Sequence, residues 1–367
     1  MIFIILLSSF TAMARFHKLK VKDIRRETVD CVSVSFEVPA NLKEEYRFLP
    51  GQYLTIKIPV TGEDIRRSYS ICSGPFEEEE LRVAIKKVKG GKGSGFLNES
   101  LKNGQEIEVM IPMGNFHSPL SASNRKKYFL FAGGSGITPM LSIIKAVLRI
   151  EQGSELTLFY GNLDPAATIF KRELDSIAAS SVNRLHLHYI YENAPVDHHP
   201  LCKGRMDVDR VRAIFDAFSG NGLNHEFFIC GPGPMMDNVM KILQEKKTPA
   251  TQTHIEYFTA AVQADTVKTN AGPSLSSRVT VSLYGIETTF ELSSHGKSVL
   301  DAALDAGVDV PFACKGAVCC TCRGRLLEGK VKMDQNFALT ESEVEAGYIL
   351  TCQSHPQTAV LRIDYDA

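Results

Sequence analysis

The spacing of hydrophobic and polar residues changes twice along the chain. From Phe16 to about Pro119, short segments alternate between apolar and polar positions, which is the period of β-strands. Turn residues such as Pro50-Gly51 and Gly90-Gly91 separate these segments. This part of the chain is therefore predicted to form an all-β barrel or sandwich. Its clearest alternating segments are Val32–Val38, Leu54–Ile58 and Leu81–Ile85.

From about Lys126 the pattern becomes an alternation of apolar runs with helical segments. Thr138 is predicted to cap a helix that has Pro139 at its first position and continues through Val147. Alternating strands and helices are typical of a doubly wound α/β domain. The predicted strands are Tyr128–Ala132, Leu156–Tyr160, His186–Tyr191 and Glu226–Cys230.

A third pattern begins after residues 259–277, a small, polar segment that ends in Ala-Gly-Pro-Ser-Leu-Ser-Ser and is predicted to be a flexible linker. Val279 and Val281 then begin a new series of strands. We therefore predict three domains, covering residues 14–122, 123–258 and 278–367. A length of 367 residues fits two or three domains.

Composition supports a globular protein and gives no indication of binding to nucleic acid or to an anionic membrane. Hydrophobic residues make up 44% and charged residues 23% of the chain, and the net charge of −1 does not favour nucleic acid or an anionic membrane. From Arg278 onward there are 12 acidic and 8 basic residues. An acidic C-terminal domain would suit electrostatic docking of an electron-transfer module, although chance surface composition gives the same count.

The first twelve residues, MIFIILLSSFTA, are apolar but too few to span a membrane. They could be the apolar part of a signal peptide, although no positively charged segment precedes them. The alternative, which we expect, is that Met13 is the natural start. No stable membrane anchor and a cytoplasmic location are therefore expected, since reducing surroundings suit redox cofactors and thiolates.

Four cysteines near the C-terminus carry the most specific signal. Cys314, Cys319 and Cys322 follow the spacing C-x4-C-x2-C, and Cys352 comes from a separate segment. This is the plant-type spacing for a [2Fe–2S] cluster, which accepts single electrons. Small residues between them would let backbone amides approach the sulfurs and tune the potential. Cys320 is off the ligand spacing and is interpreted as loop packing.

Three other chemistries of these cysteines stay open. A zinc site would use two C-x2-C pairs or histidines, and His355 lies three residues after Cys352. A redox pair at Cys319 and Cys322 would need to open a helix. Disulfides are typical of small secreted scaffolds, which this chain does not resemble in length.

Two regions have residues suited to nucleotides. In the first domain, Arg67, Tyr69 and Ser70 could bind a pyrophosphate, cover a flavin and reach its N5 atom, while the glycines of residues 90–94 expose amides for phosphate. In the second domain, Gly133–Pro139 follows a strand and opens a helix, as a phosphate-binding turn does. A second turn, Cys230–Pro234, also follows a strand, so both are expected in one crevice.

A serine hydrolase is excluded at the first of these turns. The nucleophile elbow has the pattern G-x-S-x-G, whereas Ile137 occupies the position two after Ser135.

The motifs at 67–70, 134–139, 230–232 and 256–258, followed by the cysteine pattern, resemble ferredoxin–NADP reductase-type flavoproteins with a C-terminal plant-type ferredoxin domain. The resemblance extends essentially from Ala14 to the C-terminus. It implies a β-barrel FAD domain, an α/β NAD(P)-binding domain and an α+β, β-grasp ferredoxin domain. It also implies FAD, rather than FMN alone, and NADPH or NADH as electron donor.

The resemblance assigns roles to individual residues. Ser70, Cys230 and Glu256 would lie at the site of hydride transfer. Residues implied to bind FAD are Arg67, Tyr69, Ser70, Gly91, Gly93, Ser94 and Phe258. Residues implied to bind the nicotinamide cofactor are Gly134, Gly136, Thr138, Gly231 and Pro232. The implied cluster ligands are Cys314, Cys319, Cys322 and Cys352.

One departure concerns the choice of nicotinamide. Relatives that prefer NADP often carry arginines where this chain has Leu163 and Glu192, although Lys171 and Arg172 lie nearby in sequence. A carboxylate suits a free ribose hydroxyl and opposes a 2′-phosphate. The choice between NADH and NADPH therefore stays open.

The function implied is an electron relay. Electrons would pass from NAD(P)H through FAD and the cluster to a partner oxygenase, of the phenylacetyl-CoA epoxidase type or a related ring hydroxylase. One alternative is a stand-alone NAD(P)H dehydrogenase or flavin reductase acting on small acceptors. A second is a non-catalytic iron–sulfur carrier, which the nucleotide motifs argue against.

Overall fold

The computed structural model describes residues 15–60, 62–76, 80–218, 224–258 and 274–367. Its contacts divide the chain into two compact units. One unit spans residues 17–261, and the other contains the C-terminal residues from 262 onward. Residues 1–14, with the apolar segment at 1–12, lie outside the described part of the chain.

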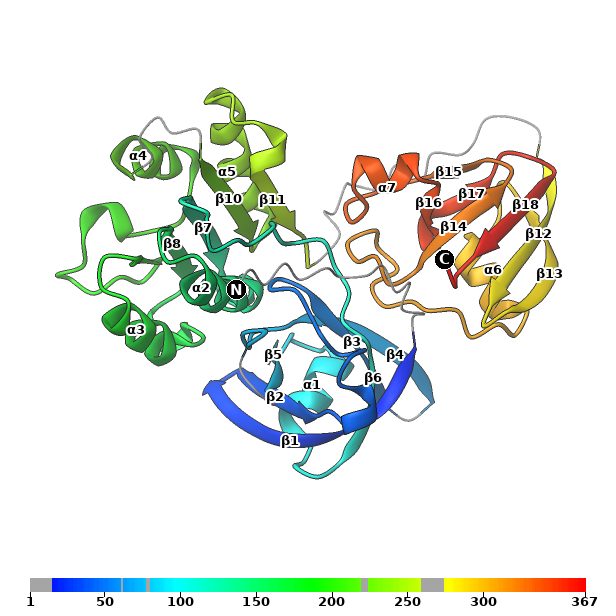
Figure 1. Ribbon diagram of the computed structural model, residues 1–367, viewed down its shortest axis with the longest axis horizontal. Coiled ribbons are helices and arrows are strands. Elements are labelled where there is room, and N and C mark those ends of the chain that lie inside the picture. The colour runs from blue at the N-terminus through cyan, green and yellow to red at the C-terminus, as the bar shows by residue number, and fades with distance from the viewer. Residues whose placement is uncertain (1–14, 61, 77–79, 219–223, 259–273) are drawn as a thin grey trace. The chain divides into compact units, whose positions relative to one another are not determined.

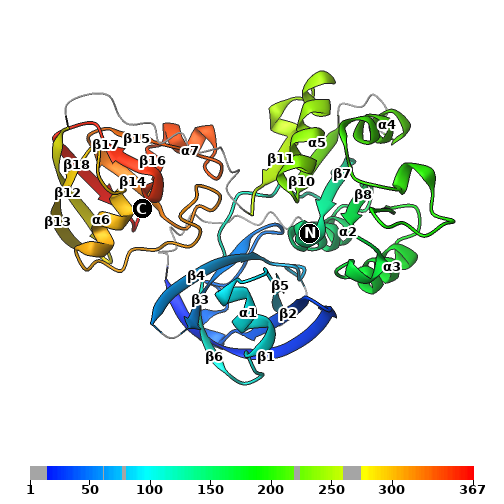
Figure 2. The ribbon, with the colours of Figure 1, turned by 180° about the vertical axis from the view of Figure 1, so that it is seen from behind.

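The first domain is a six-stranded barrel in the order β4-β3-β6-β1-β2-β5 (Figure 1). A bridge between Ile71 and Val83 joins the chain after β4 to β5 and completes the barrel. The strands are β1 (Phe16–Thr28), β2 (Cys31–Glu37), β3 (Tyr53–Val60), β4 (Glu63–Ser70), β5 (Leu81–Lys86) and β6 (Glu106–Met110). One helix, α1 (Lys92–Glu99), packs against β3 and β5 between them (Figure 2). The predicted barrel is confirmed.

The second domain is a five-stranded parallel sheet in the order β11-β10-β7-β8-β9. Its strands are β7 (Lys127–Gly133), β8 (Glu155–Asn162), β9 (Leu185–Tyr191), β10 (His225–Cys230) and β11 (Thr253–Glu256). Its helices are α2 (Ile137–Ile150), α3 (Lys171–Ser180), α4 (Val208–Phe218) and α5 (Gly233–Glu245). One core contains α2 and α3 and another contains α4 and α5, so the sheet is covered on both faces (Figure 1). The predicted doubly wound fold is confirmed.

The order of these strands reverses at β7. The chain continues from β7 to β8 and β9 on one side, and then returns to β10 and β11 on the other. Ligands of open α/β sheets bind at such a switch point, beyond the carboxyl ends of the strands. The two glycine turns, which follow β7 and β10, stand at this position.

The start of α2 differs from the prediction. The helix begins at Ile137 after a 3-10 turn, Gly134–Gly136, so Thr138 is inside the helix and is not its N-cap. The Thr138 hydroxyl instead donates a hydrogen bond to the carbonyl of Ser135 at 3.0 Å. Gly134, Ser135 and Gly136 already form a turn of 3-10 helix, so the α-helix starts at Ile137, one residue before the predicted cap.

The C-terminal unit has a five-stranded sheet in the order β13-β12-β18-β14-β16 with α6 packed against β13 (Figure 2). Its strands are β12 (Ser276–Leu283), β13 (Ile286–Ser293), β14 (Arg323–Glu328), β16 (Tyr348–Leu350) and β18 (Val360–Asp364). A small second sheet pairs β15 (Val331–Met333) with β17 (Ser354–Pro356), and the helices are α6 (Val299–Asp305) and α7 (Glu341–Glu345). This is the α+β arrangement that was expected.

The end of the predicted linker needs correction. Residues 259–273 lie outside the described part, but Ser276 and Ser277 belong to β12, where Ser277 pairs with Leu292. Polar serines can extend a strand because the ladder bonds come from the backbone. Short 3-10 helices join the larger elements at Ala40–Leu42, Pro165–Ala167, Pro200–Cys202, Ala250–Gln252 and Thr351–Gln353. No helix among the described residues has the length and apolar character that a membrane span requires.

Candidate functional site

The two glycine turns of the α/β domain are in direct contact. A Cβ atom on Gly136 would lie 2.0 Å from the carbonyl oxygen of Cys230, and one on Gly133 would lie 2.5 Å from the ring of Pro232. Side chains are therefore excluded where the turn after β7 meets the turn after β10. The two turns therefore lie together at the carboxyl ends of β7 and β10, as expected.

An orphaned polar group lies at the carboxyl end of the neighbouring strand. Asn162 is the last residue of β8, and its side chain is buried. Its Nδ2 makes no hydrogen bond of good geometry with a described residue, although the amide interacts with the hydroxyl of Tyr160. A buried amide without a partner costs free energy unless a ligand or water accepts its hydrogens. The edge of the sheet therefore fits a ligand rich in acceptors, such as a dinucleotide.

Ser70 and Glu256 meet where β4 of the barrel approaches β11 of the sheet. Ser70 is buried and donates a hydrogen bond to Oε2 of Glu256 at 3.0 Å. Glu256 pairs in register with Cys230, which in turn pairs with Ala132 at the end of β7. The structure thus brings these two predicted residues together beside the crevice, although they are far apart in sequence.

The carboxyl group of Glu256 is unusual. Although the residue is partly exposed, the protein packed around its carboxyl raises its pKa to about 8, while the Ser70 hydroxyl acts in the opposite direction. A carboxyl with this pKa can hold or release a proton near neutral pH, as a general acid or base must.

Three further predicted residues lie close to Glu256 in sequence or in strand register. Cys230 is fully buried, and burial raises the pKa of its thiol, so it stays a neutral packing group. Phe258 follows β11 and is 40% exposed, so its ring is open to contact with a ligand. Gly231 is needed because a Cβ there would lie 2.9 Å from the amide nitrogen of Gly133.

The predicted flavin motif lies along β4. Arg67 is exposed and donates one hydrogen bond to the carbonyl of Arg66 at 2.7 Å. Tyr69 is half-buried, and desolvation raises the pKa of its hydroxyl, which therefore stays neutral. The strand thus presents an exposed guanidinium, an aromatic ring and a buried hydroxyl in succession. The guanidinium fits the phosphate of a flavin nucleotide, and the other two groups fit its ring system.

The glycine-rich run before Phe96 begins a helix that no sequence pattern predicted. Gly91 is the N-cap of α1, and a Cβ on Gly93 would lie 2.8 Å from Ile58 of β3. The Ser94 hydroxyl accepts a hydrogen bond from the amide of Val88 at 3.0 Å, so it closes the turn. The amides at the start of α1 fit an anion, because a helix N-terminus carries a partial positive charge.

The four predicted ligand cysteines converge as two pairs. Cys314 and Cys319 have their sulfurs 3.1 Å apart, and Cys322 interacts by a hydrogen bond with Cys352. The hydrogen bond between them lowers the pKa of the Cys314 thiol and raises that of Cys319, because the two sulfurs share one proton. Each iron of a [2Fe–2S] cluster needs two protein ligands, so two pairs of thiols fit the two irons.

The loop around these sulfurs is shaped to present amides. Lys315 and Ala317 have positive φ angles of 50° and 64°, and the Gly316 amide donates to the sulfur of Cys314 at 3.3 Å. Such turns point successive N–H groups into one concavity that favours negative charge. Cys320 is buried, and none of the nine cysteines forms a disulfide.

Single-metal alternatives find no support in the described part of the chain. No group of three or more His, Cys, Asp or Glu side chains there is arranged to hold one metal ion. His355 donates or accepts a hydrogen bond with Asp334 at 3.1 Å, so it faces a carboxylate.

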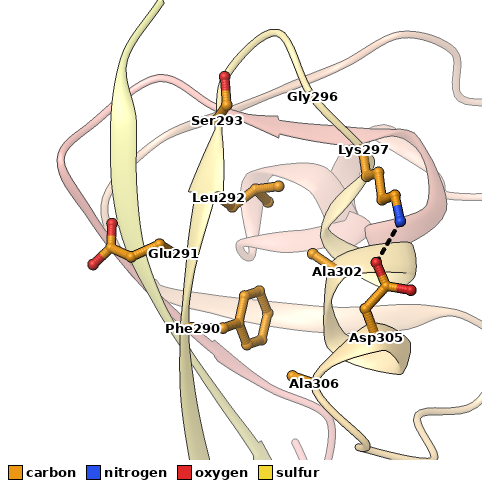
Figure 3. Close-up of a pocket in the computed structure, with 9 residues that line it drawn as sticks. All are labelled: Phe290, Glu291, Leu292, Ser293, Gly296, Lys297, Ala302, Asp305 and Ala306. Carbon is orange, nitrogen blue, oxygen red and sulfur yellow. Dashed lines mark hydrogen bonds and ion pairs between the residues drawn. The ribbon is translucent and has the colours of Figure 1, made fainter.

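A separate groove of about 350 Å³ lies in the C-terminal unit between β13 and α6 (Figure 3). Phe290 and Leu292 line its apolar side, and an ion pair between Lys297 and Asp305 lies along α6. None of the predicted site residues lines this groove.

Two of the charged residues discussed for nicotinamide choice, Glu192 and Lys171, form ion pairs. Glu192, directly after β9, forms an ion pair with Arg205 at 2.9 Å, and Leu163 after β8 is 51% exposed. Lys171 binds Asp175 at 2.7 Å and lies 4.7 Å from the ring centre of Tyr189. Sequence patterns gave no sign of Arg205, because it is 13 residues from Glu192 and in no motif.

Comparison with known families gives three matches in chain order. They are described as "Oxidoreductase FAD-binding domain" at residues 18–118, "Oxidoreductase NAD-binding domain" at 130–241 and "2Fe-2S iron-sulfur cluster binding domain" at 281–357. The chain is 38% identical over 355 residues to a component of 1,2-phenylacetyl-CoA epoxidase from Escherichia coli (strain K12). This match covers 97% of this chain and 99% of the relative. The chain belongs to the iron–sulfur flavoprotein reductases.

Other proteins are similar to almost the whole length of this chain. The ferredoxin reductase component of 3-ketosteroid-9-alpha-monooxygenase from Rhodococcus rhodochrous is 33% identical, covering 95% of this chain and 96% of the relative. Phthalate dioxygenase reductase, a modular structure for electron transfer from pyridine nucleotides to [2Fe–2S], is 25% identical with a TM-score of 0.58. That match covers 95% of this chain and 98% of the other. The protein is an NAD(P)H oxidoreductase that uses FAD and a [2Fe–2S] cluster.

Proposed function

We propose that this reductase delivers electrons from NAD(P)H to a separate oxygenase, of the phenylacetyl-CoA epoxidase type. The proposal is carried by the contact between Ser70 and Glu256, because it joins the flavin motif of the barrel to the switch point of the α/β sheet. The relatives named above are components of oxygenase systems, which supports the nature of the acceptor.

The barrel residues would bind and orient FAD. When bound, FAD accepts two electrons together and gives them up singly. Arg67 and the amides at the start of α1 would bind the pyrophosphate, since both present positive charge to an anion. Tyr69 would cover the ring system, and Ser70 would hold a hydroxyl against its reactive edge.

The crevice residues would hold the nicotinamide. Gly136 and Gly231 let the two turns pack backbone against backbone, where their amides would bind its phosphates. Thr138 fixes the first turn through its bond to Ser135. Glu256, with its raised pKa of about 8, would hold or release a proton at Oε2, and the buried Cys230 would exclude water.

The cysteines would hold the cluster as two pairs, Cys314 with Cys319 and Cys322 with Cys352. Thiolate ligands persist in reducing surroundings, which supports a reducing compartment. A cytoplasmic location is therefore part of the proposal. Fractionation of cells would test this location, and recovery of the protein outside the cytoplasmic fraction would contradict it.

The acceptor is tested by reconstitution with the oxygenase component of a phenylacetyl-CoA epoxidase. We expect NAD(P)H consumption to be coupled to product formation and to saturate with the oxygenase concentration. Free flavin and quinone serve as small acceptors in parallel assays. Rapid turnover with quinone that is unaffected by the oxygenase would instead favour a stand-alone dehydrogenase.

A further inference from the structure

Three charged or titratable side chains near the start of β10 and on β11 form a group that belongs to no predicted site. Glu226 is the second residue of β10 and is 9% exposed. Its Oε2 binds Nε2 of His254 at 2.8 Å, and its Oε1 binds Nζ of Lys126 at 2.6 Å. A paired carboxylate of this kind fixes its partners in one geometry, because each bond is charge-assisted.

His254 is held by a second contact as well. Its ring stacks on the fully buried Phe228 with centroids 4.3 Å apart and planes inclined by 17°. Phe228 in turn packs edge-on against Phe116 at 5.2 Å. The imidazole is therefore fixed in position by a rigid aromatic core on one side and by the carboxylate of Glu226 on the other.

The strand that carries His254 needs such support. β11 has only four residues, lies at the edge of the sheet and has no fully buried residue. Its ladder to β10 is short, and edge strands of this length separate from a sheet easily. Residues two apart on a strand point to the same face, so His254 and Glu256 share a face of β11.

We propose that His254 and Glu226 are positioning residues that fix β11 and thereby hold Glu256 against Ser70. The inference rests on the proposed role of Glu256 in the reaction with nicotinamide. A small displacement of β11 would break the 3.0 Å hydrogen bond between Ser70 and Glu256. Misplacement of a reacting group by about 1 Å can lower a reaction rate about a hundredfold.

Two substitutions separate the ring stack from the hydrogen bond. His254→Phe keeps an aromatic ring on Phe228 and removes the donor to Glu226, whereas His254→Gln keeps a donor and removes the ring. Hydrogen–deuterium exchange of the amides at 253–256 should become faster by about tenfold in His254→Phe, with partial rescue in His254→Gln. Unchanged exchange in both variants would overturn the proposal.

A double-mutant cycle shows whether the effect passes through Glu256. Flavin reduction by NAD(P)H in the stopped-flow apparatus should slow about tenfold in His254→Phe, but by less than about twofold when the same change is made in Glu256→Gln. The matched control is His225→Phe, because His225 lies on the neighbouring strand β10 and contacts Phe129 on the opposite face. We expect this control to leave the rate within about twofold of wild type.

The outcomes separate the positioning role of His254 from the role of Glu256 in the reaction. Equal slowing by His254→Phe in both backgrounds would overturn the positioning role and leave Glu256 in the reaction. If Glu256→Gln alone leaves flavin reduction unchanged, the role of Glu256 fails, and the positioning role fails with it. A slowing equal to that of His254→Phe in the His225→Phe control would show general loosening of the sheet and would also overturn the proposal.

Discussion

Glu256 should titrate near pH 8, and this behaviour can be measured directly. The perturbation is Glu256→Gln, which keeps the size and hydrogen-bonding capacity of the side chain and removes its charge. In the wild type, burial raises the pKa from the ordinary 4.5 to about 8. A shift of this size corresponds to at most about 5 kcal/mol between the two protonation states, and solvent at the partly exposed residue reduces it.

The sign of the pH dependence follows from this shift. Because the pKa is higher in the folded protein, the neutral carboxyl favours folding below about pH 4.5. That contribution is lost progressively as pH rises from 4.5 through about 8, where a charge must be buried. Glu256→Gln should therefore be relatively more stable than wild type above about pH 8.

Infrared difference spectroscopy, supported by ¹³C labelling of glutamate, measures the titration without catalysis. We expect a protonated carboxyl band that disappears with a midpoint near pH 8 and is absent from Glu256→Gln. In Ser70→Ala the midpoint should rise further, because the Ser70 hydroxyl favours the carboxylate. A band that persists in Glu256→Gln, or a midpoint below pH 5, would refute the reasoning.

Three other substitutions test the nucleotide sites. Gly136→Ala should lower the free energy of unfolding by about 2 kcal/mol and raise the KM for the nicotinamide cofactor, because the added Cβ would overlap a backbone carbonyl. Thermal unfolding and steady-state kinetics measure both effects, and the matched control is Gly233→Ala, whose Cβ would meet no atom within 4 Å. Glu192→Gln should raise kcat/KM for NADPH relative to NADH by about tenfold, because it frees Arg205 to bind the 2′-phosphate of NADPH. An unchanged ratio would show that this ion pair lies away from the adenosine ribose. Arg67→Ala should weaken FAD binding by about thirtyfold in a fluorescence titration, and full affinity would exclude Arg67 from the phosphate site.

The sequence patterns predicted the architecture because each domain has its own period. Strict alternation along β3 and the buried runs of β7 and β10 leave few other folds. The boundaries were less accurate. Thr138 has a residue type that suits a cap, and the 3-10 turn before it has no sequence signature, so the predicted cap was wrong. The helix α1 was not predicted because its glycines suggested a loop.

Site residues were predictable where they occur in short motifs and were not where they pair across the fold. The cysteine spacing predicted the convergence of Cys314 and Cys319, since few residues separate them. The motif predicted a role for Glu256 but not its contact with Ser70, 186 residues away in sequence. Nothing in the local sequence indicated that His254 binds Glu226, because that contact depends on the order of strands in the sheet.

Electron transfer through the cluster is the central claim, and one comparison tests it most directly. The measurement is NAD(P)H-dependent reduction of cytochrome c, a one-electron protein acceptor, by the wild type and by Cys314→Ser. Ferricyanide is the second acceptor, because the flavin can reduce it without the cluster. Cys320→Ser is the matched control, because this buried cysteine is off the ligand spacing. The account predicts that Cys314→Ser loses cytochrome c reduction and keeps ferricyanide reduction, while Cys320→Ser keeps both. Unchanged cytochrome c reduction in Cys314→Ser would contradict it.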